Sequence, residues 1–77
     1  MLTDATRDIV EDALGRPLNA EEEAGYPALA GLPPAVIEAA RTIHSSTNRV
    51  AVSVYLRHVV PSATVLEVTD FMEELFV

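Results

Sequence analysis

The 77-residue chain contains no cysteine, tryptophan or lysine, and only 5% of its residues are aromatic. Without cysteine it has no disulfide framework, no thiol nucleophile and no cysteine-based zinc site. Two histidines, His44 and His58, are too few for a histidine-built metal site, so we expect no metal. Hydrophobic residues make up 49% of the chain, and they must form one small core mainly from Leu, Val, Ile and Ala. The length allows a single domain, residues 1–77.

Basic residues are also scarce. Five arginines stand against 12 acidic residues, which gives a formal net charge of −7. This excess of acid repels phosphate backbones and anionic lipid, so we expect no nucleic acid and no membrane among the partners. The apolar runs are too short for a membrane span, and the N-terminus lacks the pattern of a signal peptide. We therefore expect a cytoplasmic protein, and the initial Met1 and the short tails favour a free-standing unit.

Hydrophobic periodicity predicts an all-α domain of three main helices and one short helix. The first runs from Asp4 to Leu14, with Thr3 as its N-cap and Gly15 as a left-handed stop. The second runs from Pro34 to His44, because proline suits the first turn of a helix. The last runs from Ala63 to Phe76 and opens with a capping box from Thr64 to Glu67.

The segment 50–60 alternates like a strand but has no partner strand, so we expect an extended segment followed by a short helix. The long connection 15–32 is expected to hold Glu21–Glu23 as a solvated acidic turn, with Tyr26 as its anchor. The expected core comprises Val10, Leu14, Ile37, Ile43, Val54, Leu56, Val65, Val68, Phe71 and Met72.

Three stretches give the chain a family resemblance: residues 8–18 (DIVEDALGRPL), residues 26–32 (YPALAGL), and residues 58–65 (HVVPSATV) followed by 71–75 (FMEEL). Over its full length the chain resembles an acyl or peptidyl carrier protein of fatty acid, polyketide or nonribosomal peptide assembly. The resemblance implies a small four-helix carrier-protein-like bundle. It also implies an aspartate followed by a serine at the start of the second helix, where the serine carries 4′-phosphopantetheine.

That serine is missing. Its position falls on Pro33 or Pro34, neither of which has a hydroxyl, so we expect no phosphopantetheine and no other cofactor. Ser45 and Ser46 lie at the other end of the second helix, on the order of 15–18 Å away. The second helix also lacks the acidic surface of ordinary carriers, because it holds only Glu38, offset by Arg41.

No side chains form a recognisable catalytic pattern, so we do not expect an enzyme. His58 matches a common structural histidine of the resembled family, and His44 lies at a helix C-terminus that favours a cation. Asp70, Glu73 and Glu74 are interpreted as an acidic helix surface rather than a cation site, because no EF-hand loop is present.

The leading hypothesis is a pseudo-carrier that is not phosphopantetheinylated and acts by contact with biosynthetic enzymes or carrier-handling proteins. Its expected partner-contact surface is a stiff, uncharged corner formed by Leu29, Gly31, Leu32, Pro33, Pro34 and Val36. The prolines equally fit a decayed site in which they only fix the loop. Two other functions stay open: non-covalent binding or delivery of an acyl chain or small metabolite, and a small acidic regulatory or antitoxin-like module.

Overall fold

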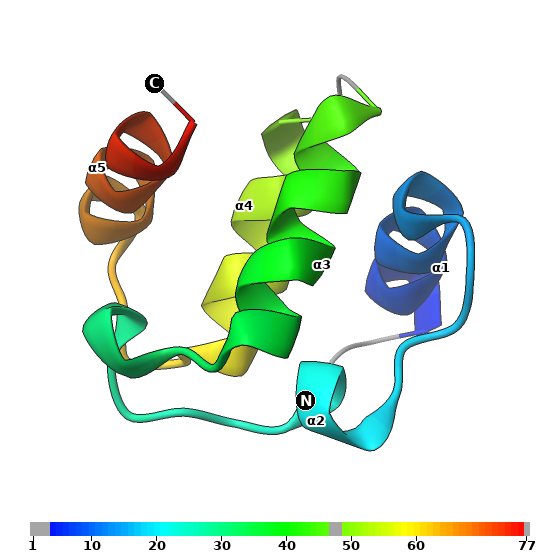
Figure 1. Ribbon diagram of the computed structural model, residues 1–77, viewed down its shortest axis with the longest axis horizontal. Helices are drawn as coiled ribbons and strands as arrows, with labels where there is room; N and C mark the ends of the chain where they lie inside the picture. The colour runs from blue at the N-terminus through cyan, green and yellow to red at the C-terminus, as the bar shows by residue number, and fades with distance from the viewer. Residues whose placement is uncertain (1–3, 47–48, 77) are drawn as a thin grey trace.

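The computed structural model describes residues 4–46 and 49–76, which form a small all-helical bundle without any β-strand (Figure 1). Five α-helices and one 3₁₀ turn follow one another in this part of the chain. They are α1 (Asp4–Leu14), α2 (Ala20–Glu23), the 3₁₀ turn η1 (Leu29–Gly31), α3 (Pro34–Ser45), α4 (Arg49–Val59) and α5 (Val65–Leu75). The predicted helical fold class is therefore confirmed. The expected N-cap Thr3 lies outside the described residues.

Helices α3 and α4 occupy the middle of the molecule, with α1 on one side and α5 on the other (Figure 1). Helix α4 packs against α1, α3 and α5 and also touches α2, so it is the central element of the core. Its side chains Tyr55, Leu56 and Val59 are completely buried. Among the described helices, none is long and apolar enough to cross a membrane.

Local signals set the ends of three helices. Helix α1 has the predicted bounds, and Gly15 after it adopts the left-handed conformation with φ 86°. Helix α3 begins at Pro34, as predicted, with Pro33 as an extended N-cap, and it ends one residue later than expected. Helix α5 starts two residues later than expected and ends one residue earlier, at Leu75. Thr64 is its N-cap: the Thr64 hydroxyl accepts from the Glu67 amide at 3.1 Å, and the Glu67 carboxylate accepts from the Thr64 amide at 3.0 Å.

The expected extended segment at the start of residues 50–60 is wrong, because α4 is helical from Arg49 to Val59. Its buried residues recur with helical rather than strand periodicity: Ala51, Val52, Tyr55, Leu56 and Val59. This helical face meets neighbours on several sides, and the packing outweighs the strand preference of its β-branched residues.

The expected core is correct in most positions. Val10, Leu14, Ile43, Leu56, Val68 and Met72 are buried. Ile37, Val54 and Phe71 are half-buried. Val65 is 55% exposed because it is the first residue of α5, at the end of the stripe that it shares with Val68 and Met72.

Candidate functional site

The connection between α1 and α3 is ordered by its own helix and by contacts with α4. Asn19 caps α2 by accepting a hydrogen bond from the Glu22 amide at 2.9 Å, and the Glu22 carboxylate accepts from the Asn19 amide at 3.1 Å. The Tyr26 amide donates to the Val59 carbonyl at 2.6 Å, and the Tyr26 hydroxyl donates to the Glu21 carbonyl at 2.8 Å. The predicted role of Tyr26 as an anchor of this connection is confirmed.

The interpretation of Glu21–Glu23 as a solvated turn is wrong for its central residue. Glu22 is only 2% exposed, and both of its carboxylate oxygens accept hydrogen bonds from the Arg16 guanidinium, at 2.7 and 2.5 Å. These bonds hold the pKa of Glu22 below its usual value and raise the pKa of Arg16. The sequence did contain a signal, because Asn19 and Glu22 have the spacing of a capping box.

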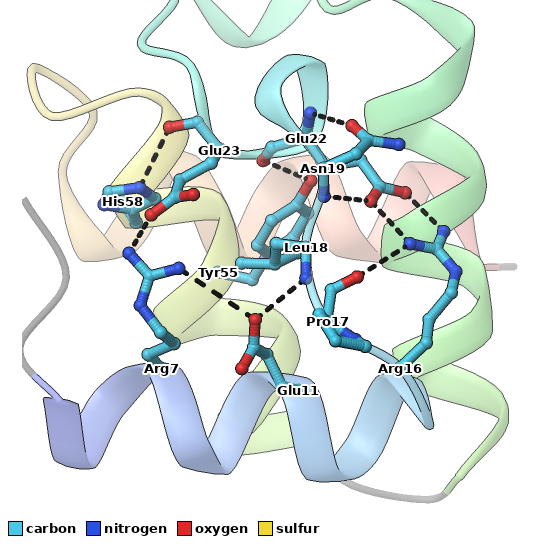
Figure 2. A network of polar contacts seen from close by, with 10 residues as sticks. All are labelled: Arg7, Glu11, Arg16, Pro17, Leu18, Asn19, Glu22, Glu23, Tyr55 and His58. Carbon is cyan, nitrogen blue, oxygen red and sulfur yellow. Dashed lines mark hydrogen bonds and ion pairs between the residues drawn. The ribbon is translucent and has the colours of Figure 1, made fainter.

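Helix α4 supplies the other side of this polar network (Figure 2). The buried Tyr55 hydroxyl donates to the Glu22 carbonyl at 2.8 Å, and burial raises the pKa of that hydroxyl. His58 Nε2 lies 3.1 Å from the Glu23 carbonyl oxygen, and burial lowers the pKa of the imidazole. A neutral His58 that donates to this carbonyl has a positioning role in the fold.

Arg7 of α1 completes the network (Figure 2). Its guanidinium pairs with Glu23, and its Nη1 lies 3.9 Å from the Glu11 carboxylate. Glu11 in turn accepts a hydrogen bond from the Leu18 amide at 2.8 Å. Arg7 and Glu11 join the connection to α1, and Tyr55 and His58 join it to α4, so the network holds the connection in place.

The corner predicted as a partner-contact surface lies where η1 leads into α3. Gly31 and Pro34 are exposed, whereas Leu29, Leu32 and Pro33 are half-buried. Leu29 and Leu32 pack against the core with part of their surface. Val36, the sixth predicted contact residue, needs a correction. It is completely buried because it is on the face of α3 that packs into the core, so it cannot touch a partner at this surface.

Next to this corner, a groove of about 500 Å³ lies between the segment 27–30, the α4–α5 junction and one face of α5. Its apolar lining includes Leu29, Val60 and Phe71. Along α5 it is bordered by three exposed carboxylates: Glu67, Asp70 and Glu74. Figure 1 shows η1 next to the connection that leads from α4 into α5. The sequence analysis missed the groove, because it depends on the contact between two segments that are far apart in the chain.

The remaining predicted residues lie elsewhere. The His44 and Phe76 rings stack at 3.9 Å with an interplanar angle of 4°, which joins the ends of α3 and α5. The Ser45 hydroxyl donates to the Thr42 carbonyl at 2.8 Å, and the Ser46 hydroxyl to the Ile43 carbonyl at 2.6 Å, at the end of α3 opposite Pro34.

The described residues contain no group of three or more histidine, aspartate or glutamate side chains that could hold a metal ion. The corner and the adjacent groove are both open and partly apolar, which suits contact with a ligand. When the chain is compared with known proteins, no family model, no curated protein and no solved structure matches it.

Proposed function

We propose that the protein is a carrier-protein-like domain that is not phosphopantetheinylated and that acts by binding other proteins. The observation that carries this proposal is the start of α3. Pro33 is its N-cap with φ −71° and ψ 158°, and Pro34 is its first residue, so no hydroxyl stands where the resemblance places the modified serine. The biosynthetic assembly in which it acts is of the polyketide, fatty acid or nonribosomal peptide type.

The corner between η1 and α3 supports a binding role. The two prolines restrict the backbone before any partner arrives, so little conformational entropy remains to be lost on binding. Leu29 and Leu32 keep part of their apolar surface open beside the exposed Gly31 and Pro34. A rigid surface of this kind, with apolar and uncharged residues, suits contact with a protein.

Mass spectrometry of the intact protein tests the loss of the prosthetic group. After incubation with a promiscuous phosphopantetheinyl transferase and coenzyme A, the natural chain should gain no mass. The matched variant carries Pro33→Asp and Pro34→Ser, which restores the acid and the serine implied by the resemblance. Once circular dichroism has shown that this variant is folded, it should gain one phosphopantetheine.

Each outcome of that experiment decides a different part of the proposal. Loading of the natural chain would contradict the loss of the prosthetic group, and mapping it to Ser45, Ser46, Ser53 or Ser62 would identify another attachment site. A folded double variant that stays unloaded would contradict the carrier-like origin. Genes for ketosynthases or condensation enzymes beside this gene would support the assembly, and a neighbouring toxin gene would contradict it.

A further inference from the structure

The groove along α5 has an unusual combination of linings. One wall carries the half-buried side chains Leu29 and Phe71. The other edge carries Glu67, Asp70 and Glu74, which are spaced at i, i+3 and i+7 and so lie on one face of the helix. Seven residues of helix correspond to about 10 Å, or two turns. The groove thus has an apolar wall and, along its other edge, an acidic border two helical turns long, formed by Glu67, Asp70 and Glu74.

The acidic border has no counter-charge in the described part of the chain. Glu67, Asp70 and Glu74 form no ion pair there, whereas the acids of the polar network, Glu11, Glu22 and Glu23, all pair with Arg7 or Arg16. One oxygen of Glu67 accepts from the Thr64 amide, which caps the helix but leaves the negative charge in place. Three neighbouring carboxylates without a cation attract a basic ligand.

Apolar surface continues beyond the acidic border. Leu66 is 70% exposed, and it precedes Asp70 by one helical turn. A ligand that covers the acidic border therefore reaches apolar side chains on both sides of it, Phe71 in the groove and Leu66 outside. A small ligand does not reach the apolar groove, the acidic border and Leu66 at the same time, but a helix about as long as α5 does.

We propose that this groove binds a basic amphipathic helix of a partner protein. An apolar side chain of that helix fills the groove against Leu29 and Phe71. Lysine or arginine side chains spaced at one and two turns face Glu67, Asp70 and Glu74. The inference rests on the proposed function in one respect, namely that the ligand is a protein, and it adds the chemistry of the partner and the face that binds it.

Other occupants of the groove fit its charge less well. A second copy of this chain carries the same net charge of −7, so charge repulsion opposes self-association through an acidic face. A free fatty acid would bring its own carboxylate to the acidic border. These two occupants therefore serve as competing outcomes in the test.

A designed peptide tests the proposal without knowledge of the natural partner. The probe is a fluorescently labelled amphipathic helix of leucine and lysine, about 14 residues or four turns long. The test variant is Asp70→Asn with Glu74→Gln, which leaves the capping residue Glu67 intact. The matched control is Asp8→Asn with Asp12→Asn, which removes two exposed charges at i, i+4 from α1 instead. Fluorescence anisotropy gives the affinities, and amide chemical shifts give the location.

We expect the test variant to weaken binding by about fivefold or more and the control by less than about twofold. The amide chemical-shift changes on adding the peptide should concentrate on residues 28–30 and 67–74. A third variant, Ala30→Arg, should abolish these changes because its side chain fills the groove and adds a positive charge to it. Equal losses in the two double variants, shifts centred elsewhere, or equal binding of a leucine and glutamate peptide would overturn the proposal.

Two further results would also overturn it. One is a concentration-dependent dimer that Ala30→Arg dissolves, and the other is tighter binding of a fatty acid than of the peptide, with shifts at the same residues. A negative result for peptide binding at the groove can be told apart from a failure of the proposed function. The phosphopantetheine-loading test of the natural chain and of the variant with Pro33→Asp and Pro34→Ser does not depend on Asp70 or Glu74.

Discussion

Replacing Glu22 with glutamine tests whether a buried carboxylate holds the connection between α1 and α3 in place. The substitution keeps the size and one acceptor oxygen but removes the charge. In the structure, Oε1 of Glu22 accepts from both Arg16 and the Asn19 amide, and Oε2 accepts from Arg16 alone. If the glutamine oxygen takes the place of Oε1, its NH₂ group faces the second guanidinium nitrogen, donor against donor.

The expected loss follows from these contacts. A hydrogen bond to a charged group contributes about 1.5–3 kcal/mol, and the half-exposed Arg16 side chain lets water weaken this pair. We therefore expect Glu22→Gln to lower the free energy of unfolding by about 1–2 kcal/mol at pH 7, at or just below the lower end of that range. For a domain of this size each kcal/mol corresponds to a fall of about 4–8 °C in Tm.

The loss should also depend on pH. The hydrogen bonds from Arg16 lower the pKa of Glu22 in the folded state, while in the unfolded chain it is about 4.3. Ionised Glu22 therefore stabilises the fold fully above pH of about 4.3, and this contribution disappears as the pH falls through the lower folded-state pKa. The difference between the natural chain and Glu22→Gln should be largest at pH 7 and should shrink in acid.

Urea unfolding followed by circular dichroism at pH 7 and at acidic pH measures both effects. Glu21→Gln is the matched control, because Glu21 is the exposed neighbour of Glu22 in the same short helix and should change stability by no more than about 0.5 kcal/mol. The reasoning is refuted if the two variants are equally stable at pH 7, or if the loss in Glu22→Gln is the same at both pH values.

Three further predictions use the same unfolding assay. Tyr55→Phe should cost about 1–3 kcal/mol because it leaves a buried carbonyl without its donor, whereas Tyr26→Phe removes only an exposed hydrogen bond and should cost about 0.5 kcal/mol or less. Leu56→Ala should cost about 2–5 kcal/mol, but Leu66→Ala, at a 70% exposed position, should stay within about 0.5 kcal/mol. Gly15→Ala should cost about 1–2 kcal/mol because its φ of 86° is unfavourable for alanine. Equal losses within the tyrosine or leucine pair, or no loss at Gly15, would contradict these arguments.

The helices with local boundary signals were predictable from the sequence. Gly15 ends α1, Pro34 begins α3 and the pair Thr64 and Glu67 begins α5, and each signal acts within a few residues of the boundary that it sets. Helix α4 was less predictable, because its alternating valines fit a strand as well as a helix. Only its contacts with α1, α3 and α5 favour the helix, and these contacts are not visible in a local pattern.

The candidate site divides in the same way. The prolines at the start of α3 are visible in the sequence, and their N-terminal position in that helix is confirmed. The groove was not predictable, because Leu29 and Phe71, which both line it, are 42 positions apart in the chain. Val36 is buried because it lies on the face of α3 that packs into the core. The sequence at the start of the helix does not show which apolar residue will lie on that face.

The packing of α5 mainly on one neighbour has a consequence for how the molecule opens. Helix α5 packs mainly on α4, through Val68 and Met72, whereas α4 is also covered by α1 and α3. Detaching α5 breaks its interface with α4 and the His44–Phe76 stack but leaves the packing of α1, α3 and α4 in place, so the backbone amides of α5 should exchange with solvent through partial opening. The backbone amides of α4 should exchange with solvent only when the whole domain unfolds. The acidic border lies on the helix that we expect to open first, so a partner that binds there should also stabilise this helix against opening.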